Sequence, residues 1–219
     1  MQKYLDDIST GKRYTLSDMV RASCNDCAGC SSCCEDMGDS ILLDPLDIYE
    51  LTGHLHRTFE QLMDQSIELH VADGMILPNL KMSAETNACP FLNEQGRCSI
   101  HSFRPGICRV FPLGRIYEDG KLDYFLQAEG CVKQERSKVK VGKWLDTPDL
   151  KRNQKYLIDW HAFRKKIGEI LAAMDDENQK RTINLFLLKT FYIQPYDGSG
   201  DFYPQFYERM EKIKQVIGN

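Results

Sequence analysis

Five of the nine cysteines stand within eleven residues, at Cys24, Cys27, Cys30, Cys33 and Cys34. Thiolates at every third residue can converge from a tight turn onto one metal centre, and soft thiolate ligands suit zinc, copper(I) and iron–sulfur clusters. Disulfides are a poor alternative because each bridge needs a Cα separation and side-chain directions that so crowded a run cannot provide for all five. The run therefore predicts a metal or iron–sulfur site.

The spacing from Cys24 to Cys34 matches that of a bacterial ferredoxin, in which the last cysteine of the run binds a second cluster. A further ligand must then come from elsewhere in the chain. A second register, beginning at Cys27, is equally compatible with the spacing. The candidates for remote ligands are the four later cysteines, Cys89, Cys98, Cys108 and Cys131.

Zinc is the competing interpretation. Four-thiolate zinc sites usually join two separate Cys-x2-Cys pairs, whereas the pairs in this run overlap. Cys98 and His101 could add a Cys/His pair to such a site. The overlapping spacing favours an iron–sulfur cluster of the [4Fe–4S] type. Eight thiolates would suffice for two such clusters, or for one cluster and a mononuclear site; zinc remains the alternative.

The composition restricts the class of protein. Hydrophobic residues make up 42% and charged residues 27% of the 219, as in ordinary globular domains. The net charge of −4 gives no indication of a nucleic-acid partner, and no apolar stretch reaches the roughly 18–20 residues of a membrane span. Acidic residues near the start stand where a signal peptide needs an apolar core, so we expect a cytoplasmic protein whose thiols stay reduced.

Positive charge is concentrated between Lys133 and Lys166, where eleven Lys or Arg face four Asp or Glu. One interpretation is a set of solvated helix faces. The other is a docking surface for an acidic protein, either a protein substrate or a redox partner, or for an anionic cosubstrate.

Helix signals surround the cysteine run. Residues 16–22 predict a short helix leading into it. Asp44-Pro45 reads as an N-cap followed by proline at the first helical position, which predicts a helix to about Leu51. Thr58 and Gln61 form a capping-box pattern that opens a second helix.

Three hairpins are predicted between the later cysteines and around them. Residues 67–82 alternate in polarity about Asp73-Gly74, a hairpin-turn dipeptide. A small hairpin is expected around residues 93–96, and another at Asp119-Gly120. After Cys131 the pattern becomes helical, with helices predicted after Thr147-Pro148, over 181–192 and from about 203 to 217.

Together these elements predict an α+β protein: a small cysteine-rich domain of short helices and hairpins with a helical C-terminal part. The expected division is an N-terminal arm at 1–20, a metal- or cluster-binding domain at 21–145 and the helical part at 146–219.

Residues 27–34 (CAGCSSCC), followed by residues 43–48 (LDPLDI), resemble the opening signature of the CxxCxxCC (YkgJ-like) family. Residues 89–112 are similar to the second block of that family, and Cys131 stands where the family carries a late cysteine. The family is described as zinc- or iron-chelating. It includes the flagellin lysine N-methylases, which resemble iron–sulfur methyltransferases that use S-adenosylmethionine.

The resemblance covers roughly residues 24–135 and implies a set of eight metal ligands: Cys27, Cys30, Cys33, Cys34, Cys89, Cys98, Cys108 and Cys131. Cys24 lies just outside the signature and remains an alternative ligand. The implied function is an iron–sulfur protein in redox chemistry or in S-adenosylmethionine-dependent protein methyl transfer. The alternative is a non-enzymatic zinc- or iron-chelating module, and no catalytic residue is assigned.

Arg104 and Arg109 flank Cys108 and are predicted cofactor-binding residues. Guanidinium groups beside an anionic thiolate cluster stabilise it and raise its potential. They could instead hold a carboxylate or phosphate of a ligand, or form ion pairs with Asp44 or Asp47.

Overall fold

The computed structural model describes residues 9–23, 30–128, 130–133 and 135–217, and it confirms the mixed α+β class. Its strands form three small antiparallel sheets, one of them three-stranded in the order β1-β6-β5. The other two are the pairs β2-β7 and β3-β4. The strands are β1 (Ser9–Tyr14), β2 (Met19–Ser23), β3 (Ile67–Ala72), β4 (Met75–Leu80), β5 (Leu113–Glu118), β6 (Lys121–Gln127) and β7 (Ser137–Lys140).

The first two helices confirm both cap predictions. Helix α2 (Pro45–Leu55) begins after Asp44, whose carboxylate accepts from Leu46 N and Asp47 N at 3.0 Å each. Helix α3 (Phe59–Gln65) begins at a capping box formed by Thr58 and Gln61. Helix α2 runs past the predicted end at Leu51, because the chain turns left-handed only at His56 (φ 52°), whose N–H donates to Thr52 O.

Two predicted hairpins are confirmed. Strands β3 and β4 turn at Asp73-Gly74 (φ 52° and 78°), and β5 and β6 turn at Asp119-Gly120 (φ 49° and 69°). Positive φ at both central residues matches the right-handed twist of the flanking strands, which is why Asp-Gly suits these positions. The third hairpin is reduced to a single bridge between Leu92 and Cys98.

The predicted helix at residues 16–22 is wrong, because this segment contains strand β2. Val20 and Ala22 are buried while Met19 and Arg21 are exposed, which is the period of two of a strand with one buried face. The partner of β2 is β7, which follows Cys131 and was not predicted.

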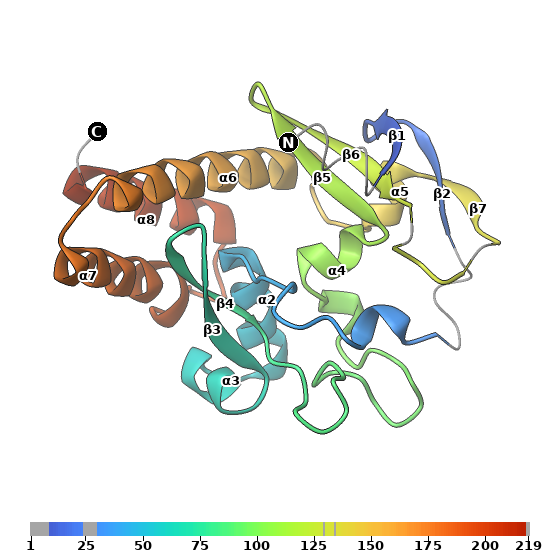
Figure 1. Cartoon of the computed structure of the whole chain (residues 1–219), viewed down its shortest axis with the longest axis horizontal. Coiled ribbons are helices and arrows are strands. Elements are labelled where there is room, and N and C mark those ends of the chain that lie inside the picture. The colour runs from blue at the N-terminus through green and yellow to red at the C-terminus, as the bar shows by residue number, and fades with distance from the viewer. Residues whose placement is uncertain (1–8, 24–29, 129, 134, 218–219) are drawn as a thin grey trace.

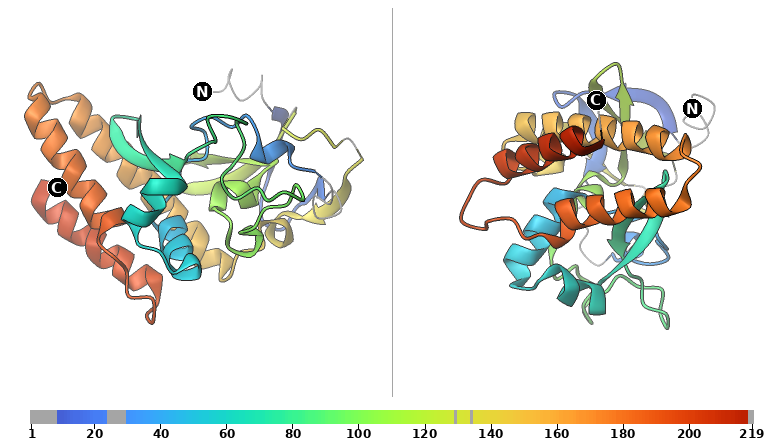
Figure 2. Two further views of the ribbon diagram at one scale, coloured as in Figure 1. Left: turned by 90° about the horizontal axis from the view of Figure 1, so that it is seen from below. Right: turned by 90° about the vertical axis from the view of Figure 1, so that its left-hand side faces the viewer.

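The remaining helices are short around the cysteines and long in the C-terminal part, where Figures 1 and 2 show α6, α7 and α8 gathered at one end of the molecule. They are η1 (Ser32–Cys34), η2 (His101–Phe103), α4 (Gly106–Val110), α5 (Val141–Leu145), α6 (Leu150–Ala172), α7 (Glu177–Leu188), the π-helical turn η3 (Lys189–Ile193) and α8 (Phe202–Ile217). None of the helices in the described part of the chain combines the length and the apolar character of a membrane span.

The helical end packs against the hairpins and α2 through one continuous apolar core. Tyr156 of α6 accepts a hydrogen bond from Leu46 N at 3.2 Å. Asn184 of α7 accepts from Ile76 N at 2.8 Å and donates to Gly74 O at 3.1 Å. These bonds fix α6 and α7 against the elements that carry the cysteine loops.

Candidate metal centre

All seven cysteines of the described residues are free thiols, and all seven line one cavity of about 760 Å³. They come from four segments: the loop around η1, the loop between β4 and α4, helix α4 itself and the segment after β6. The cysteines are Cys30, Cys33, Cys34, Cys89, Cys98, Cys108 and Cys131. The predicted ligand Cys27 and the alternative Cys24 lie outside the described residues.

Backbone hydrogen bonds hold the first two cysteine loops side by side. Cys89 N donates to Cys34 O at 2.7 Å, and an isolated antiparallel bridge joins Glu35 to Ala88. Asp36 N donates to Asn87 O at 2.9 Å. Because these bonds involve the main chain, the loops keep their alignment without help from the thiols.

Four of the thiols lie within electrostatic range of one another. Burial raises the pKa of the Cys108 thiol well above its usual range, and the nearby Asp47, Cys89, Cys33 and Cys98 raise it further. Burial is also the main cause of the raised pKa of Cys89, to which Cys98 and Cys33 contribute. Four partly buried thiols that oppose one another's ionisation cannot all become thiolates unless a cation offsets their charge.

Cys33 has a further neighbour within the first loop. A side-chain hydrogen bond with Cys34 is the main cause that raises the pKa of the Cys33 thiol, and burial is the second. This contact connects the group of four thiols, Cys33, Cys89, Cys98 and Cys108, to the rest of the cysteine-lined wall.

The donor set suits zinc or iron, since both are bound by thiolates. Across the part of the chain that the structure describes, no three or more His, Cys, Asp or Glu side chains are already arranged so that they could hold a metal ion. The seven thiols therefore share a cavity without forming a finished coordination shell. In thiol-rich loops the ligands commonly reach their final positions only when the metal binds, so that metal binding and folding are coupled.

The two predicted arginines take different positions. Arg104 lines the cavity. Burial raises the pKa of the Cys98 thiol, while the Ile100 backbone N–H and the Arg104 charge act in the opposite direction. Arg104 also contacts His101, and both side chains line the cavity.

Arg109 is not among the residues that line the cavity. Its guanidinium donates to Arg104 O at 3.1 Å and to Asp146 O at 2.9 Å, and it also donates to Ser102 O. Arg109 therefore joins the loop before α4 to the end of α5.

A buried set of side chains around Gly106, the Gly106 bracket, was not predicted from the sequence. Asp47 accepts from Gly106 N at 2.7 Å and from Asp44 N at 2.9 Å, while Arg115 donates to Gly106 O at 3.0 Å. Both the N–H and the C=O of Gly106 are thus hydrogen-bonded, two residues before Cys108. The charge that offsets Asp44 and Asp47 is therefore Arg115, which the sequence signals did not single out.

Burial raises the pKa of Asp47 to about 8, and the neighbouring Asp44 contributes to the shift. Burial also raises the pKa of Asp44 itself. The backbone N–H groups and the Arg115 charge act against both shifts. The bracket is therefore a compact group of buried ionisable side chains at the start of α4.

Such a convergence of thiols from separate loops defines a cysteine-rich metal-chelating domain. The chain belongs to the CxxCxxCC family, described as a "putative zinc- or iron-chelating domain", whose model matches residues 26–138, just over half of the 219 residues. No curated protein and no solved structure matches the chain.

Proposed function

We propose that the cysteine-lined cavity holds an iron–sulfur centre and that the protein uses it in redox chemistry. The observation that carries this proposal is the convergence of seven cysteines from four segments on one cavity. Its volume of about 760 Å³ lies in the range of about 300–1,000 Å³ that small-molecule and cofactor pockets occupy. A single four-coordinate zinc ion needs neither that space nor seven thiols.

The electrostatic neighbours suggest how the ligands divide. Cys33, Cys89 and Cys98 all raise the pKa of Cys108, and Cys33 and Cys98 also raise that of Cys89, so we assign these four thiols to one [4Fe–4S] centre. Cys30, Cys34 and Cys131 line the same cavity and, with Cys27, would complete a second four-thiolate set.

The cluster would supply one-electron chemistry, and the protein would set its potential. Arg104 beside the thiols stabilises negative charge and so favours the reduced state. A centre that keeps only three thiolates would leave one iron open to a ligand such as S-adenosylmethionine. Protein methyl transfer is the more specific form of the proposal, and it depends on such an open position.

A non-enzymatic zinc- or iron-chelating module is the second candidate. The position of Cys108 favours it, because this thiol is partly buried on a short helix whose start is fixed by Asp47 and Arg115. A thiol held in place by the fold suits a structural zinc site, in which the protein occupies all four coordination positions.

Metal and acid-labile sulfide analysis of protein purified without oxygen separates the two. We expect iron with sulfide and a broad absorbance near roughly 400 nm from thiolate–iron charge transfer. Cys108→Ser should remove the centre that contains it, and Cys131→Ser should remove only the second. Cys24→Ser tests the alternative ligand, and we expect it to retain the full iron and sulfide content. Zinc without sulfide in the wild-type protein would contradict the iron–sulfur proposal.

A further inference from the structure

The outer face of the two-stranded sheet β2-β7 is rich in cations, and neither strand contains an acidic residue. In its antiparallel register Arg21 lies opposite Lys138 and Met19 lies opposite Lys140. Residues opposite each other, and residues two apart, point to the same side of a sheet. Arg21, Lys138 and Lys140 therefore share one face with Met19, whose exposed fraction is 50%.

The inner face of the same sheet faces the cysteine cavity. Val20, next to Arg21, is 1% exposed, and Val139, between the two lysines, lines the cysteine cavity. Cys131 and Lys133, in the segment that leads to β7, line it too. A single layer of backbone thus separates the basic outer face from the cavity.

This placement of charge is unfavourable for the isolated sheet. Like charges directly opposite each other on a strand pair are destabilising, and Arg21 faces Lys138 across the pair. Among the described residues no carboxylate forms an ion pair with Arg21, Lys138 or Lys140. An acidic partner would supply the missing opposite charge.

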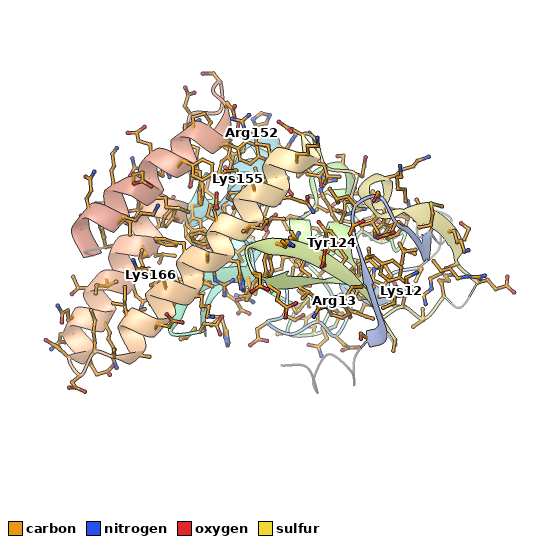
Figure 3. All side chains as sticks on the ribbon, turned by 90° about the horizontal axis from the view of Figure 1, so that it is seen from above. Lys12, Arg13, Tyr124, Arg152, Lys155 and Lys166 are labelled. Carbon is orange, nitrogen blue, oxygen red and sulfur yellow. The ribbon has the colours of Figure 1, made fainter. Side chains whose placement is uncertain are left out.

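The other part of the basic segment differs. Figure 3 shows Arg152, Lys155 and Lys166 spread along α6. On this helix Arg152 pairs with Asp201 at 2.6 Å, and Lys155 pairs with Asp159 at 2.5 Å. Much of the helix charge is therefore satisfied within the chain, while the charge of β7 is not.

We infer that the outer face of β2-β7 docks an acidic one-electron carrier protein that exchanges electrons with the centre behind it. The inference rests on the proposed iron–sulfur function. In the exchange the reduced carrier loses one electron and the cluster gains it, with no bond made or broken in either protein. Electrostatic complementarity of this kind chiefly accelerates association and orients the partners.

The test measures electron transfer from a reduced plant-type [2Fe–2S] ferredoxin, chosen as an acidic carrier, to the full-length, cluster-loaded protein by stopped-flow absorbance. Lys138→Glu/Lys140→Glu should slow the reaction about tenfold at low ionic strength. The wild-type rate should also fall as salt is added, because screening weakens the attraction. The carboxylate introduced at position 138 would face Arg21 as an opposite charge, so this variant should fold; circular dichroism checks that.

The matched control is Lys165→Glu/Lys166→Glu on α6, which changes the net charge by the same amount at exposed positions. It should leave the rate within about twofold of wild type. Equal slowing in both double variants, or in neither, overturns the docking site. The docking site is also overturned if the substitutions at positions 138 and 140 weaken binding to phosphatidylserine vesicles or to single-stranded DNA but leave the rate of electron transfer from the ferredoxin unchanged.

Iron and sulfide content is measured on the same samples. A loaded protein with unaffected rates overturns the docking site alone. A protein without iron and sulfide overturns both the docking site and the iron–sulfur proposal.

Discussion

Replacing Asp47 tests whether the bracket around Gly106 supports the metal centre. The Asp47 side chain is 7% exposed and accepts two backbone N–H bonds, from Asp44 at 2.9 Å and from Gly106 at 2.7 Å. An amide offers only one oxygen, so Asp47→Asn leaves one of these N–H groups without an acceptor. Asp47→Ala leaves both.

The size of the effect follows from the number of N–H groups left unsatisfied. Each buried group that loses its partner costs about 1–3 kcal/mol. Asp47→Asn should therefore lower the free energy of unfolding by about 1–3 kcal/mol and Asp47→Ala by about 2–6 kcal/mol. Values in the lower half are expected, because burial already disfavours the charged form of Asp47, whose pKa is raised to about 8. A loss of this size is a large fraction of the roughly 5–15 kcal/mol that stabilises a typical domain.

The assay is equilibrium urea denaturation followed by circular dichroism, with metal content measured on the folded protein. Asp64→Asn on the exposed side of α3 is the control and should change stability by no more than about 0.5 kcal/mol. Asp47→Ala should also retain less metal, because Gly106 lies two residues before Cys108. Equal costs for the Asn and Ala variants, or metal content at the control level in both, would refute the reasoning.

Three further predictions concern packing, pH and metal. An added Cβ at Gly168 of α6 would lie 2.8 Å from Asp73 O, so Gly168→Ala should lower the free energy of unfolding by about 1–3 kcal/mol. An added Cβ at Gly53 would have no neighbour within 4 Å, so Gly53→Ala should raise it by about 0.5–1 kcal/mol. Urea denaturation measures both changes. Partial burial, helped by neighbouring cations, lowers the pKa of His161, which stacks on Tyr117, below the ordinary 6.5. The unfolded chain then binds the proton more readily, so stability should fall as pH drops through 6.5, and His161→Phe should flatten that fall in urea titrations between pH 5 and 8. Removing the metal with a chelator under reducing conditions should lower the Tm and expose the cysteine loops to protease, and an unchanged Tm would count against coupled folding and binding.

Local signals in the sequence predicted the local structure well. The cap at Asp44, the capping box at Thr58 and the two Asp-Gly turns all appear where their residues indicate. Each of these features depends on residues within about four positions of one another, so nothing distant in the chain needs to be known.

Long-range pairing was the part that the sequence could not supply. Strand β2 has only five residues, and its pattern was compatible with a short helix. What makes it a strand is β7, which lies more than a hundred residues later. The alternation of Val20 and Ala22 became informative only once this partner was known.

The candidate site shows the same division. Cysteine spacing and the family resemblance predicted a shared site, and the seven described cysteines do share a cavity. Sequence proximity to Cys108 drew attention to Arg104 and Arg109, but only Arg104 lines the cavity. Arg115 lies on β5, in the three-stranded sheet, and only the tertiary fold brings it into contact with Gly106.

The charges around the cavity help to define what it can hold. A zinc ion or a four-iron core, each bound by four thiolates, leaves a centre with about two negative charges. The cations that line the cavity are Arg97, Arg104, Lys133 and Lys143, with one carboxylate, Asp146, and a further cation, Arg115, that is already opposed by Asp44. Together they outweigh the charge of one such centre and offset part of a second. Charge alone therefore accommodates zinc and iron equally. The number of thiols and the volume are what separate them, because seven cysteines and about 760 Å³ exceed the needs of a single four-coordinate ion. These two grounds are the reasons for which we propose a multinuclear centre.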